Sequence, residues 1–187
     1  MNPWETPPTG PAADLAAGLA MRVPTLATAR LALRAPRMTD FDAFAGVFDG
    51  PRADHIGGAL SRDDAMEVFL AATGSWALRG HGLWSVERRA DCALLGFVLL
   101  QHETGDPEAE LGYLFTLQAE GRGYATEAAA AARDFARDVL RWPSVVSYVA
   151  PENTRSVAVA ERLGAVPDAE MLDGCRVYRH LLQGNGS

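Results

Sequence analysis

The chain has 187 residues, of which 48% are hydrophobic and 22% are charged, and its formal net charge is −7. This composition suits one compact domain with a hydrophobic core. The negative charge argues against a general nucleic-acid binder, because such binding needs a basic surface. The start of the chain has neither a basic segment nor a long apolar run, so we expect no signal peptide, no membrane span and a cytoplasmic protein.

The sequence contains two cysteines, Cys92 and Cys175. They are too few and too unpatterned for a disulfide scaffold or a metal site. We therefore expect no bound metal and two buried thiols, because a free cysteine usually behaves as a small buried hydrophobe.

Residues 1–25 differ in composition from the rest of the chain. Small residues surround five prolines there, namely Pro3, Pro7, Pro8, Pro11 and Pro24. This pattern predicts an irregular N-terminal arm, with a short helix from Asp14 to Met21. No linker rich in proline, glycine or serine interrupts the remainder, so residues 26–187 are expected to form a single domain.

The first part of this domain predicts one strand and two helices. Residues Arg30–Arg34 alternate between charged and apolar side chains, as a strand does. Thr39 and Asp40 offer a helix N-cap before an apolar helical face, and Ser61 begins a second capping signal. The loop between the two helices, residues 49–60, could line a substrate cleft.

The middle of the chain predicts a meander followed by a helix. Three β-rich runs, separated by polar turns, cover residues 83–87, 94–100 and 110–115. An alanine-rich helix is predicted from Gly123 to Leu140, and its apolar stripe comprises Ala128, Ala132, Phe135 and Val139. His81 and His102 flank strand ends, where we expect them on the surface.

The last part predicts further strands and one more helix. Strands are expected at residues 145–149, 169–172 and 175–181. The helix is expected to begin near Asn153 and to end at Gly164, a typical residue for the position after a helix. Asp173-Gly174 is a tight-turn signal between the two closing strands. The order of elements indicates a mixed α/β protein.

The segment from Gln118 to Ala125 lies between a predicted strand and a predicted helix. Gly121 and Gly123 permit tight bends, and N–H groups at the start of a helix can converge on one anion. A Walker A loop needs Lys and then Ser or Thr after its last glycine, whereas Tyr124 follows here. A dinucleotide fingerprint needs a third glycine where this chain has Thr126. An ordinary capping turn and a phosphate site of another class stay open.

Four segments in order carry a family resemblance. The pattern Gln118-x-x-Gly121-x-Gly123-x-Ala125 resembles the acetyl-CoA pyrophosphate loop of the GNAT acetyltransferases. Asn153-Thr154-Arg155-Ser156, with Gly164 after it, resembles the second characteristic segment of that family. Glu110-Leu111-Gly112-Tyr113 and Thr28-Ala29-Arg30-Leu31 resemble its Rim-type branch, which acetylates protein N-termini among other substrates. The resemblance covers residues 26–182.

The resemblance implies a GNAT fold, which is a mixed α/β fold with a central, mostly antiparallel sheet, a splayed parallel pair of strands and a few flanking helices, about four in number. It implies an acetyl-CoA-dependent N-acetyltransferase in which a primary amine attacks the thioester directly in a ternary complex. The acceptor would be a protein N-terminus or a small-molecule amine, and the protein a monomer or homodimer. A non-catalytic acyl-CoA-binding or sensing domain is the alternative, and a phosphate-binding module without coenzyme A is a third.

The resemblance also implies cofactor-binding residues. N–H groups of the glycine loop would hold the pyrophosphate, while the Arg122 side chain either adds charge or lies in solvent. N–H groups near residues 114–116 would polarise the thioester carbonyl, and Gly112 would form a bulge that opens the sheet or pack beneath a helix. The implied set is Leu114, Phe115, Thr116, Gln118, Gly121, Arg122, Gly123, Tyr124, Ala125, Thr126, Asn153 and Ser156.

Amine acetylation also needs a base, because a free amine is mostly protonated at neutral pH. Glu110 is the first candidate, since strand alternation puts it on the same face as Gly112. Glu87 and His55 are the other candidates. Glu110 can equally be a solvated carboxylate at the end of a strand.

The departing thiolate needs a partner as well. Many family members carry a tyrosine seven residues after the asparagine, but this chain has Ala160 at that position. Ser156, one helical turn after Asn153, is therefore the candidate to hydrogen-bond the sulfur. The competing interpretation is that Ser156 is an ordinary hydroxyl in the first turn of a helix.

Overall fold

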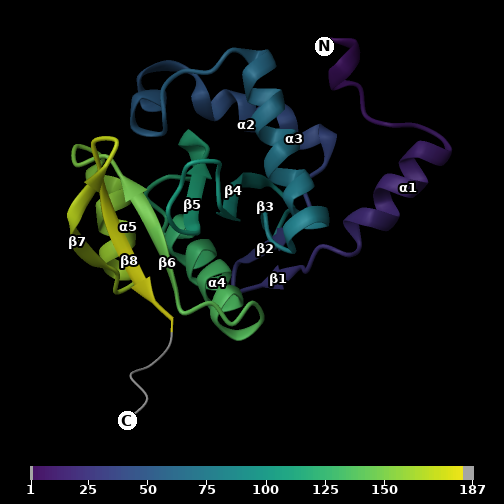
Figure 1. Cartoon of the computed structure of the whole chain (residues 1–187). Coiled ribbons are helices and arrows are strands. Elements are labelled where there is room, and N and C mark those ends of the chain that lie inside the picture. Colours follow the sequence, from purple (N-terminus) through teal and green to yellow (C-terminus); the bar gives the residue numbers. More distant parts are fainter. Residues whose placement is uncertain (1, 183–187) are drawn as a thin grey trace.

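The computed structural model describes residues 2–182, apart from the side chains of residues 51 and 52, so the last five residues of the predicted domain lie outside it. An eight-stranded sheet in the order β1-β2-β3-β4-β5-β6-β8-β7 forms the centre (Figure 1). Its strands are β1 (Leu26–Ala27), β2 (Leu31–Arg34), β3 (Leu83–Arg88), β4 (Leu94–Gln101), β5 (Glu110–Phe115), β6 (Ser144–Val149), β7 (Val166–Leu172) and β8 (Cys175–Leu181).

The described residues contain five α-helices and five short 3-10 turns. The helices are α1 (Pro11–Ala20), α2 (Phe41–Ala45), α3 (Arg62–Arg79), α4 (Tyr124–Asp138) and α5 (Thr154–Arg162). The 3-10 turns are η1 (Pro3–Glu5), η2 (Met38–Asp40), η3 (Gly46–Phe48), η4 (Gly50–His55) and η5 (Leu117–Ala119). Helices α2 to α5 flank the sheet, which confirms the predicted mixed α/β fold. No helix among these residues combines the length and apolar character that crossing a bilayer requires.

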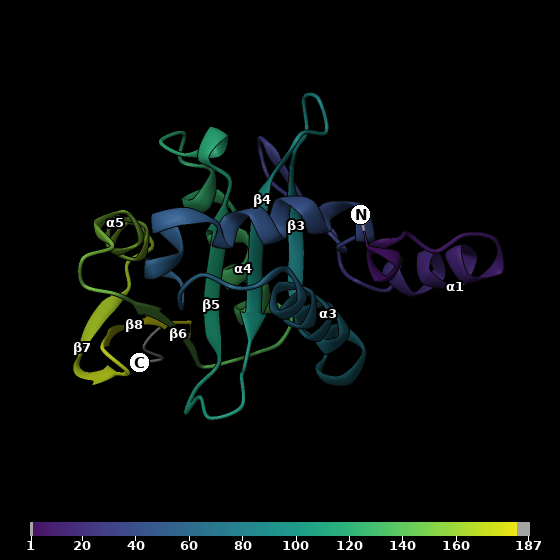
Figure 2. The ribbon, with the colours of Figure 1, turned by 90° about the horizontal axis from the view of Figure 1, so that it is seen from above.

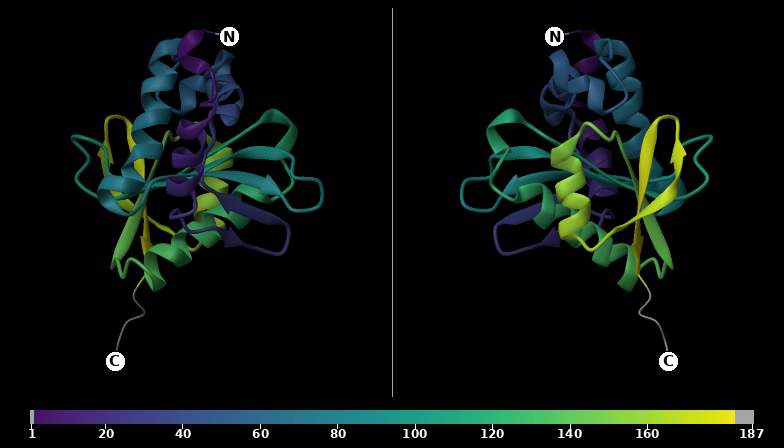
Figure 3. Two further views of the ribbon diagram at one scale, coloured as in Figure 1. Left: turned by 90° about the vertical axis from the view of Figure 1, so that its right-hand side faces the viewer. Right: turned by 90° about the vertical axis from the view of Figure 1, so that its left-hand side faces the viewer.

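Helices cover both faces of the sheet, as the two side views show (Figure 3). Alternate residues of β4 point to opposite sides: Phe97 packs with α2 and α3, whereas Val98 packs with α4. Strand β3 divides in the same way, with Leu83 on the first side and Trp84 on the second. A strand that is buried on both faces reads as a continuous apolar run, which explains the sequence of β4.

Strands β5 and β6 form the one parallel pair among the described strands, and they separate almost at once. Their register is defined by a single pair, Glu110 and Val146. Beyond it, β6 leaves with β8 and β7 as a separate ribbon (Figure 3). Where the backbones part, the Ser147 hydroxyl donates a hydrogen bond to the Leu111 carbonyl oxygen at 2.7 Å. A side chain therefore replaces the backbone ladder at the start of the splay.

The structure corrects the predicted origin of this opening. Gly112 forms no bulge, because β4 and β5 keep one uninterrupted register, and the irregularity lies between Val86 and Glu87 in β3. A Cβ atom at Gly112 would lie 2.9 Å from the Leu99 side chain, which would have to shift, so the glycine serves packing here. The sheet opens because β6 turns away from β5.

Both predicted N-cap residues begin helices, but only one of them makes the expected side-chain cap. The Ser61 hydroxyl caps α3 by accepting the Asp64 N–H at 3.1 Å, as expected. Asp40 holds the N-cap position of α2, but its side chain accepts no N–H of that helix. Its carboxylate instead accepts the Arg37 N–H at 2.8 Å, in a capping box on the preceding turn η2. It also accepts two hydrogen bonds from Arg34, at 2.7 and 2.9 Å, and one from the buried Ser85 hydroxyl at 2.7 Å. A buried carboxylate needs such partners more than a helix end does.

Several predicted environments also differ in the structure. His81 is buried, and its Nδ1 lies 2.8 Å from the Leu100 carbonyl oxygen. Cys92 is exposed and Cys175 is partly exposed, so neither is a fully buried thiol. Val139 is 61% exposed because α4 ends at Asp138, one residue before it.

The N-terminal arm contains the expected helix, which begins three residues earlier than predicted. Helix α1 buries none of its residues, and Figure 2 shows it projecting from the body beside β3 and α3. The arm is held near its start by Glu5, whose buried carboxylate accepts hydrogen bonds from Arg62 at 2.6 and 3.1 Å. Trp4 adds an edge-on contact with the Phe41 ring.

Candidate active site

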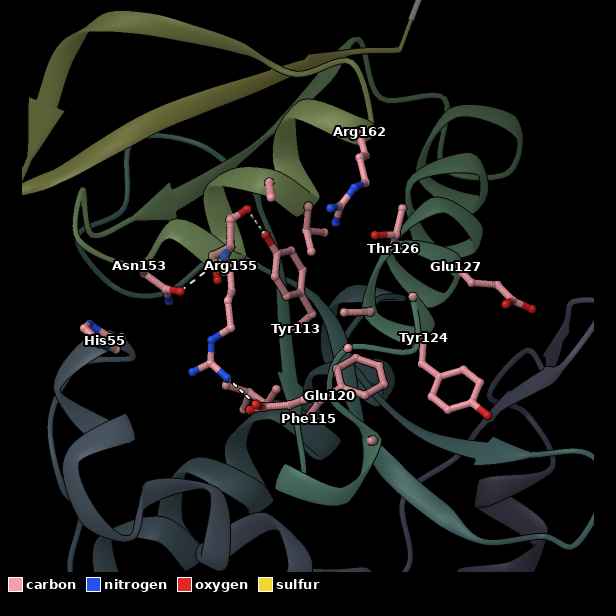
Figure 4. Close-up of a pocket in the computed structure, with 18 of the residues that line it drawn as sticks. His55, Tyr113, Phe115, Glu120, Tyr124, Thr126, Glu127, Asn153, Arg155 and Arg162 are labelled. Atoms are coloured by element: carbon pink, nitrogen blue, oxygen red, sulfur yellow. Dashed lines mark hydrogen bonds and ion pairs between the residues drawn. The ribbon is translucent and has the colours of Figure 1, made fainter.

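A cleft of about 840 Å³ lies between the start of α4, the end of β5 and helix α5 (Figure 4). The β5–α4 loop contributes Gly121 and Gly123, α4 contributes Tyr124 to Glu127, and α5 contributes residues that include Ser156. This volume lies within the range of small-molecule and cofactor sites. The cleft therefore joins the two segments in which the sequence predicted cofactor contacts.

The glycine loop has the geometry of an anion site. Gly121 and Gly123 adopt φ values of +69° and +76°, a conformation that residues with a Cβ atom rarely adopt. Among the described residues, no group accepts a hydrogen bond from the N–H of Gly121, Arg122 or Gly123. Helix α4 begins at the next residue, so its positive dipole end and its unpaired first N–H groups face the same place.

Arg30 fixes this loop from the other side. Glu127, in the first turn of α4, accepts hydrogen bonds from the Thr28 hydroxyl at 2.5 Å and from Arg30 Nε at 2.6 Å. The Arg30 guanidinium also donates to the Arg122 carbonyl oxygen at 3.0 Å and lies 4.6 Å from the centre of the Tyr124 ring. The β1–β2 turn, whose residues carried part of the family resemblance, therefore holds the start of α4 in place.

Helix α5 forms the opposite wall of the cleft. Asn153 is its N-cap and accepts the Ser156 N–H at 3.1 Å, while the Tyr113 hydroxyl donates to the Ser156 carbonyl oxygen at 3.0 Å. Arg155 forms an ion pair with Glu120 of the loop (Figure 4). Arg162 also lines the cleft and is the one arginine among the described lining residues that forms no ion pair.

Most of the predicted cofactor residues do line this cleft. They are Leu114, Phe115, Gly121, Gly123, Tyr124, Ala125, Thr126, Asn153 and Ser156. Thr116, Gln118 and the exposed Arg122 do not line it. Thr116 instead donates to the Leu95 carbonyl oxygen, from its N–H at 2.9 Å and from its hydroxyl at 3.1 Å.

The bond from Thr116 also shows which way the N–H groups of β5 point. Backbone groups alternate in direction along a strand, so the N–H of Leu114 faces β4, as that of Thr116 does. The backbone groups of Tyr113 and Phe115 then face β6, on the side where β6 has turned away. The predicted donors at Leu114 and Thr116 therefore point away from the splay.

A second cavity, of about 480 Å³, adjoins the first, and residues of β5 line both. The two cavities share six lining residues: His55, Ile56, Tyr113, Leu114, Asn153 and Ser156. The loop of residues 49–60 contributes His55, Ile56, Gly57 and Leu60 to the lining of the second cavity, which agrees with its predicted place beside a cleft. Glu110 lines the second cavity and not the first.

Glu110 lies in an environment that suits a base. Burial raises the pKa of its carboxyl group to about 8, and the nearby carboxylates of Glu103 and Asp106 add to the effect. The Tyr148 backbone N–H, released by the splay, acts in the opposite direction by favouring the charged form. A carboxyl group whose pKa lies near neutral pH can both accept and hold a proton under physiological conditions.

The other two base candidates have different surroundings. Glu87 accepts a hydrogen bond from Arg34 Nε at 2.6 Å and so belongs to the buried ion-pair network around Asp40. It lines neither cavity. His55 lines both cavities, and its Nδ1 atom is buried with no hydrogen-bond partner among the described residues. The sequence placed Glu110 first and kept Glu87 and His55 as the other candidates, and the cavity positions separate Glu87 from the other two.

The sequence did not indicate Tyr113 or Arg162 as site residues. Both could have been suspected from spacing, since Tyr113 lies between two predicted site residues and Arg162 lies two turns after Arg155. The absent tyrosine also has a structural context. Ala160 is fully buried against Val149 and lines neither cavity.

A family model described as an acetyltransferase (GNAT) domain matches residues 30–166, which is well over half of the chain. The chain belongs to the GNAT acetyltransferase family. The enzyme is therefore an acetyl-CoA-dependent N-acetyltransferase, and its glycine loop, helix dipole and arginines provide suitable partners for the phosphates of coenzyme A.

Relatives of known structure agree with this assignment. An acetyltransferase from Agrobacterium tumefaciens is 40% identical to this GNAT protein, with a TM-score of 0.80 over 84% of this chain and 94% of that chain. The ribosomal-protein α-N-acetyltransferase RimL, solved with coenzyme A, shares the fold at 16% identity and a TM-score of 0.65, over 85% of this chain and 98% of that one. The uncharacterized protein YkkB of Bacillus subtilis is 31% identical over 90 residues, which span 46% of this chain and 52% of that protein.

Proposed function

We propose that the enzyme transfers the acetyl group of acetyl-CoA directly to a primary amine in a ternary complex, the amine belonging to a small molecule or a protein N-terminus. The observation that carries the proposal is the meeting of two cavities at the β5–β6 splay, with Glu110 in one and the glycine loop in the other. Each substrate has its own cavity, and six shared residues mark the junction.

The cofactor occupies the larger cleft in this proposal. N–H groups from Gly121 to Ala125 hold the pyrophosphate, and Arg162 adds a charge that no carboxylate of the described residues neutralises. Asn153 binds the pantetheine arm while it caps α5. Arg122 and Gln118 contribute to cofactor binding only through the loop backbone, because their side chains do not line the cleft.

Glu110 is the base in this proposal. It takes a proton from the incoming ammonium, so that the neutral amine can attack. When bound, acetyl-CoA supplies an activated thioester carbonyl. The Tyr113 N–H faces the splay, where a donor placed in advance can stabilise the developing oxyanion by about 3–4 kcal/mol.

The Ser156 and Tyr113 hydroxyls are the candidates to hydrogen-bond the leaving thiolate. Both residues line both cavities. The Tyr113 hydroxyl donates its one proton to the Ser156 carbonyl oxygen, so it must exchange that bond for one to the sulfur as the thiolate forms. Burial raises the pKa of the Tyr113 phenol, so the phenol keeps its proton as a donor. This pair takes the place of the tyrosine that Ala160 replaces.

Two measurements on the wild-type protein test the proposal. Titration of acetyl-CoA should release heat and raise the melting temperature, because a ligand that binds only the folded state stabilises it. Mixing with acetyl-CoA and a broad panel of amines and peptides should release free thiol in proportion to acetylated amine. Binding without turnover on any amine would indicate a sensing domain, and the absence of both signals would refute the proposal altogether.

A further inference from the structure

The second cavity has two chemically different walls. Aromatic and aliphatic side chains from α2, η3 and α3 form one wall, and they are Phe44, Phe48, Val68 and Ala72. Carboxylates form the other wall: Glu103 and Asp106 from the β4–β5 loop, Glu110 from β5 and Asp173 from the β7–β8 turn. No arginine is among the described lining residues, and the sequence contains no lysine.

These carboxylates are not neutralised by the protein, although others in the same loop are. Glu108 lies between them in sequence and forms an ion pair with Arg179, Oε1 to Nη2 at 2.7 Å. Glu103 receives a hydrogen bond from the neutral Gln101 amide, and Asp106 receives one from a backbone N–H at 3.0 Å. The positive charge that would balance the cavity is therefore not supplied by the described residues.

A tyrosine also lies on the acidic side of this cavity. Tyr148 is partly exposed and lines this cavity, and its buried hydroxyl oxygen lies near the Glu108 backbone without a hydrogen bond of normal geometry among the described residues. Burial and the carboxylates of Asp106, Glu108 and Glu110 raise the pKa of Tyr148 to about 12, so the oxygen stays neutral. A neutral hydroxyl oxygen can accept a hydrogen bond from an ammonium group.

We infer that the acceptor is a small aliphatic diamine, with one amine at Glu110 and a second, protonated amine between Glu103 and Asp106. This inference rests on the proposed function and names its substrate class. The methylene chain of such a molecule packs on the apolar wall beside Phe44 and Phe48, while its charged end stays with the carboxylates. A cavity of about 480 Å³ holds a molecule of this size.

A peptide N-terminus suits the cavity less well. A peptide brings one ammonium group, which the reaction itself must neutralise, and leaves Glu103, Asp106 and Asp173 without a counter-charge. It also brings backbone N–H and C=O groups, which an apolar wall cannot satisfy. The diamine satisfies both walls at once.

The test compares amines that differ by one charge. Thiol release is measured with saturating acetyl-CoA and either 1,4-diaminobutane, butylamine or a short neutral peptide amide with a free N-terminus. We expect kcat/KM for the diamine to exceed that for butylamine at least tenfold, since charge-assisted contacts discriminate by about this factor. The absence of lysine means that no ε-amino group of the enzyme itself competes as an acceptor.

A pair of variants locates the effect. Glu103→Gln combined with Asp106→Asn should bring the diamine-to-monoamine ratio close to one. Glu67→Gln combined with Glu170→Gln removes the same charge from residues outside the cavity and should keep the wild-type ratio. Added salt should lower the wild-type ratio, because Glu103 is exposed and Asp106 is partly exposed to solvent.

The outcomes separate this inference from the function on which it rests. Equal kcat/KM for the diamine and butylamine in the wild type, or a preference for the neutral peptide, would refute the diamine and leave the acetyltransferase intact. A ratio unchanged by Glu103→Gln with Asp106→Asn would refute the assigned carboxylates. No thiol release from any amine would overturn the proposed function together with the inference.

Discussion

The two cavities that meet at β5 present different chemical groups to a ligand. The proposed cofactor cleft presents backbone N–H groups and a helix end, and its acidic side chains, Glu120 and Glu127, are both paired with arginines. The proposed acceptor cavity presents side chains, and its carboxylates have no arginine partner among the described residues. Backbone groups recognise a feature common to all phosphates, whereas side chains can be exchanged to suit one amine. The comparison explains why the sequence reveals the cofactor more readily than the acceptor.

Glu110→Gln should produce the largest effect. The effect should appear in catalysis and not in the binding of acetyl-CoA. We expect kcat to drop by a factor of about 10²–10⁴, because the general base is lost, while the Kd for acetyl-CoA stays unchanged. In the wild type the rate should rise with pH up to about 8, as Glu110 loses its proton. The pH–rate profile and a parallel titration with acetyl-CoA measure both quantities. Wild-type turnover in the variant would remove Glu110 from the mechanism.

The same substitution has an opposite and measurable effect on stability. The folded state holds the Glu110 proton more tightly than the unfolded state, whose pKa is near 4.5. This contribution to stability is therefore fully present below pH 4.5 and is lost as the pH rises to about 8. Denaturant unfolding of Glu110→Gln should lack this pH dependence, and the variant should be more stable than the wild type at pH 8.

Gly123→Val should affect only the cofactor cleft. At φ +76° a β-branched side chain strains the loop and displaces the N–H groups, although the Cβ itself meets nothing closer than 3.6 Å. We expect the Kd for acetyl-CoA, measured by calorimetry, to rise at least tenfold. Gly164→Val is the matched control, since Gly164 has the same φ of +76° after α5 and does not line the cleft. Equal losses in both variants would indicate general strain.

Arg162→Gln should have a smaller effect, confined to the same cleft. Losing one unpaired charge beside the phosphates should raise the Kd for acetyl-CoA by about threefold to tenfold, and the effect should shrink in high salt. Arg176→Gln removes the same charge from an exposed position on β8 that lines neither cavity. If both variants bind alike, the cleft depends on its backbone alone.

Ser147→Ala tests the hydrogen bond at the start of the β5–β6 splay. It removes the buried bond to the Leu111 carbonyl oxygen and a 3.2 Å contact with the buried His180 ring. We expect the free energy of unfolding to fall by about 1–3 kcal/mol, because a buried acceptor is left unsatisfied. Chemical denaturation measures the loss. A neutral result would mean that the splay does not depend on this bond.

The residues of the proposed cofactor site could be predicted because they lie close together in sequence. Gln118 to Ala125 form one strand-to-helix connection, and the start of a helix creates an anion site wherever it occurs. The segment after Asn153 is equally local. By contrast, Arg30 reaches the loop from about 90 residues away, and its contact with Glu127 followed from no local pattern.

The sequence by itself determined the order of strands and helices, the glycine loop, the cap at Asn153 and the family, since all of these depend on neighbours in the chain. The sequence ranked Glu110 before Glu87 as a base, but only the tertiary structure showed that Glu87 is paired with Arg34 whereas Glu110 lines a cavity. It also decided that Gly112 packs against Leu99 and that Thr116 bonds to Leu95. Burial and charge at a side chain are set by residues distant in sequence, and no local spacing contains them.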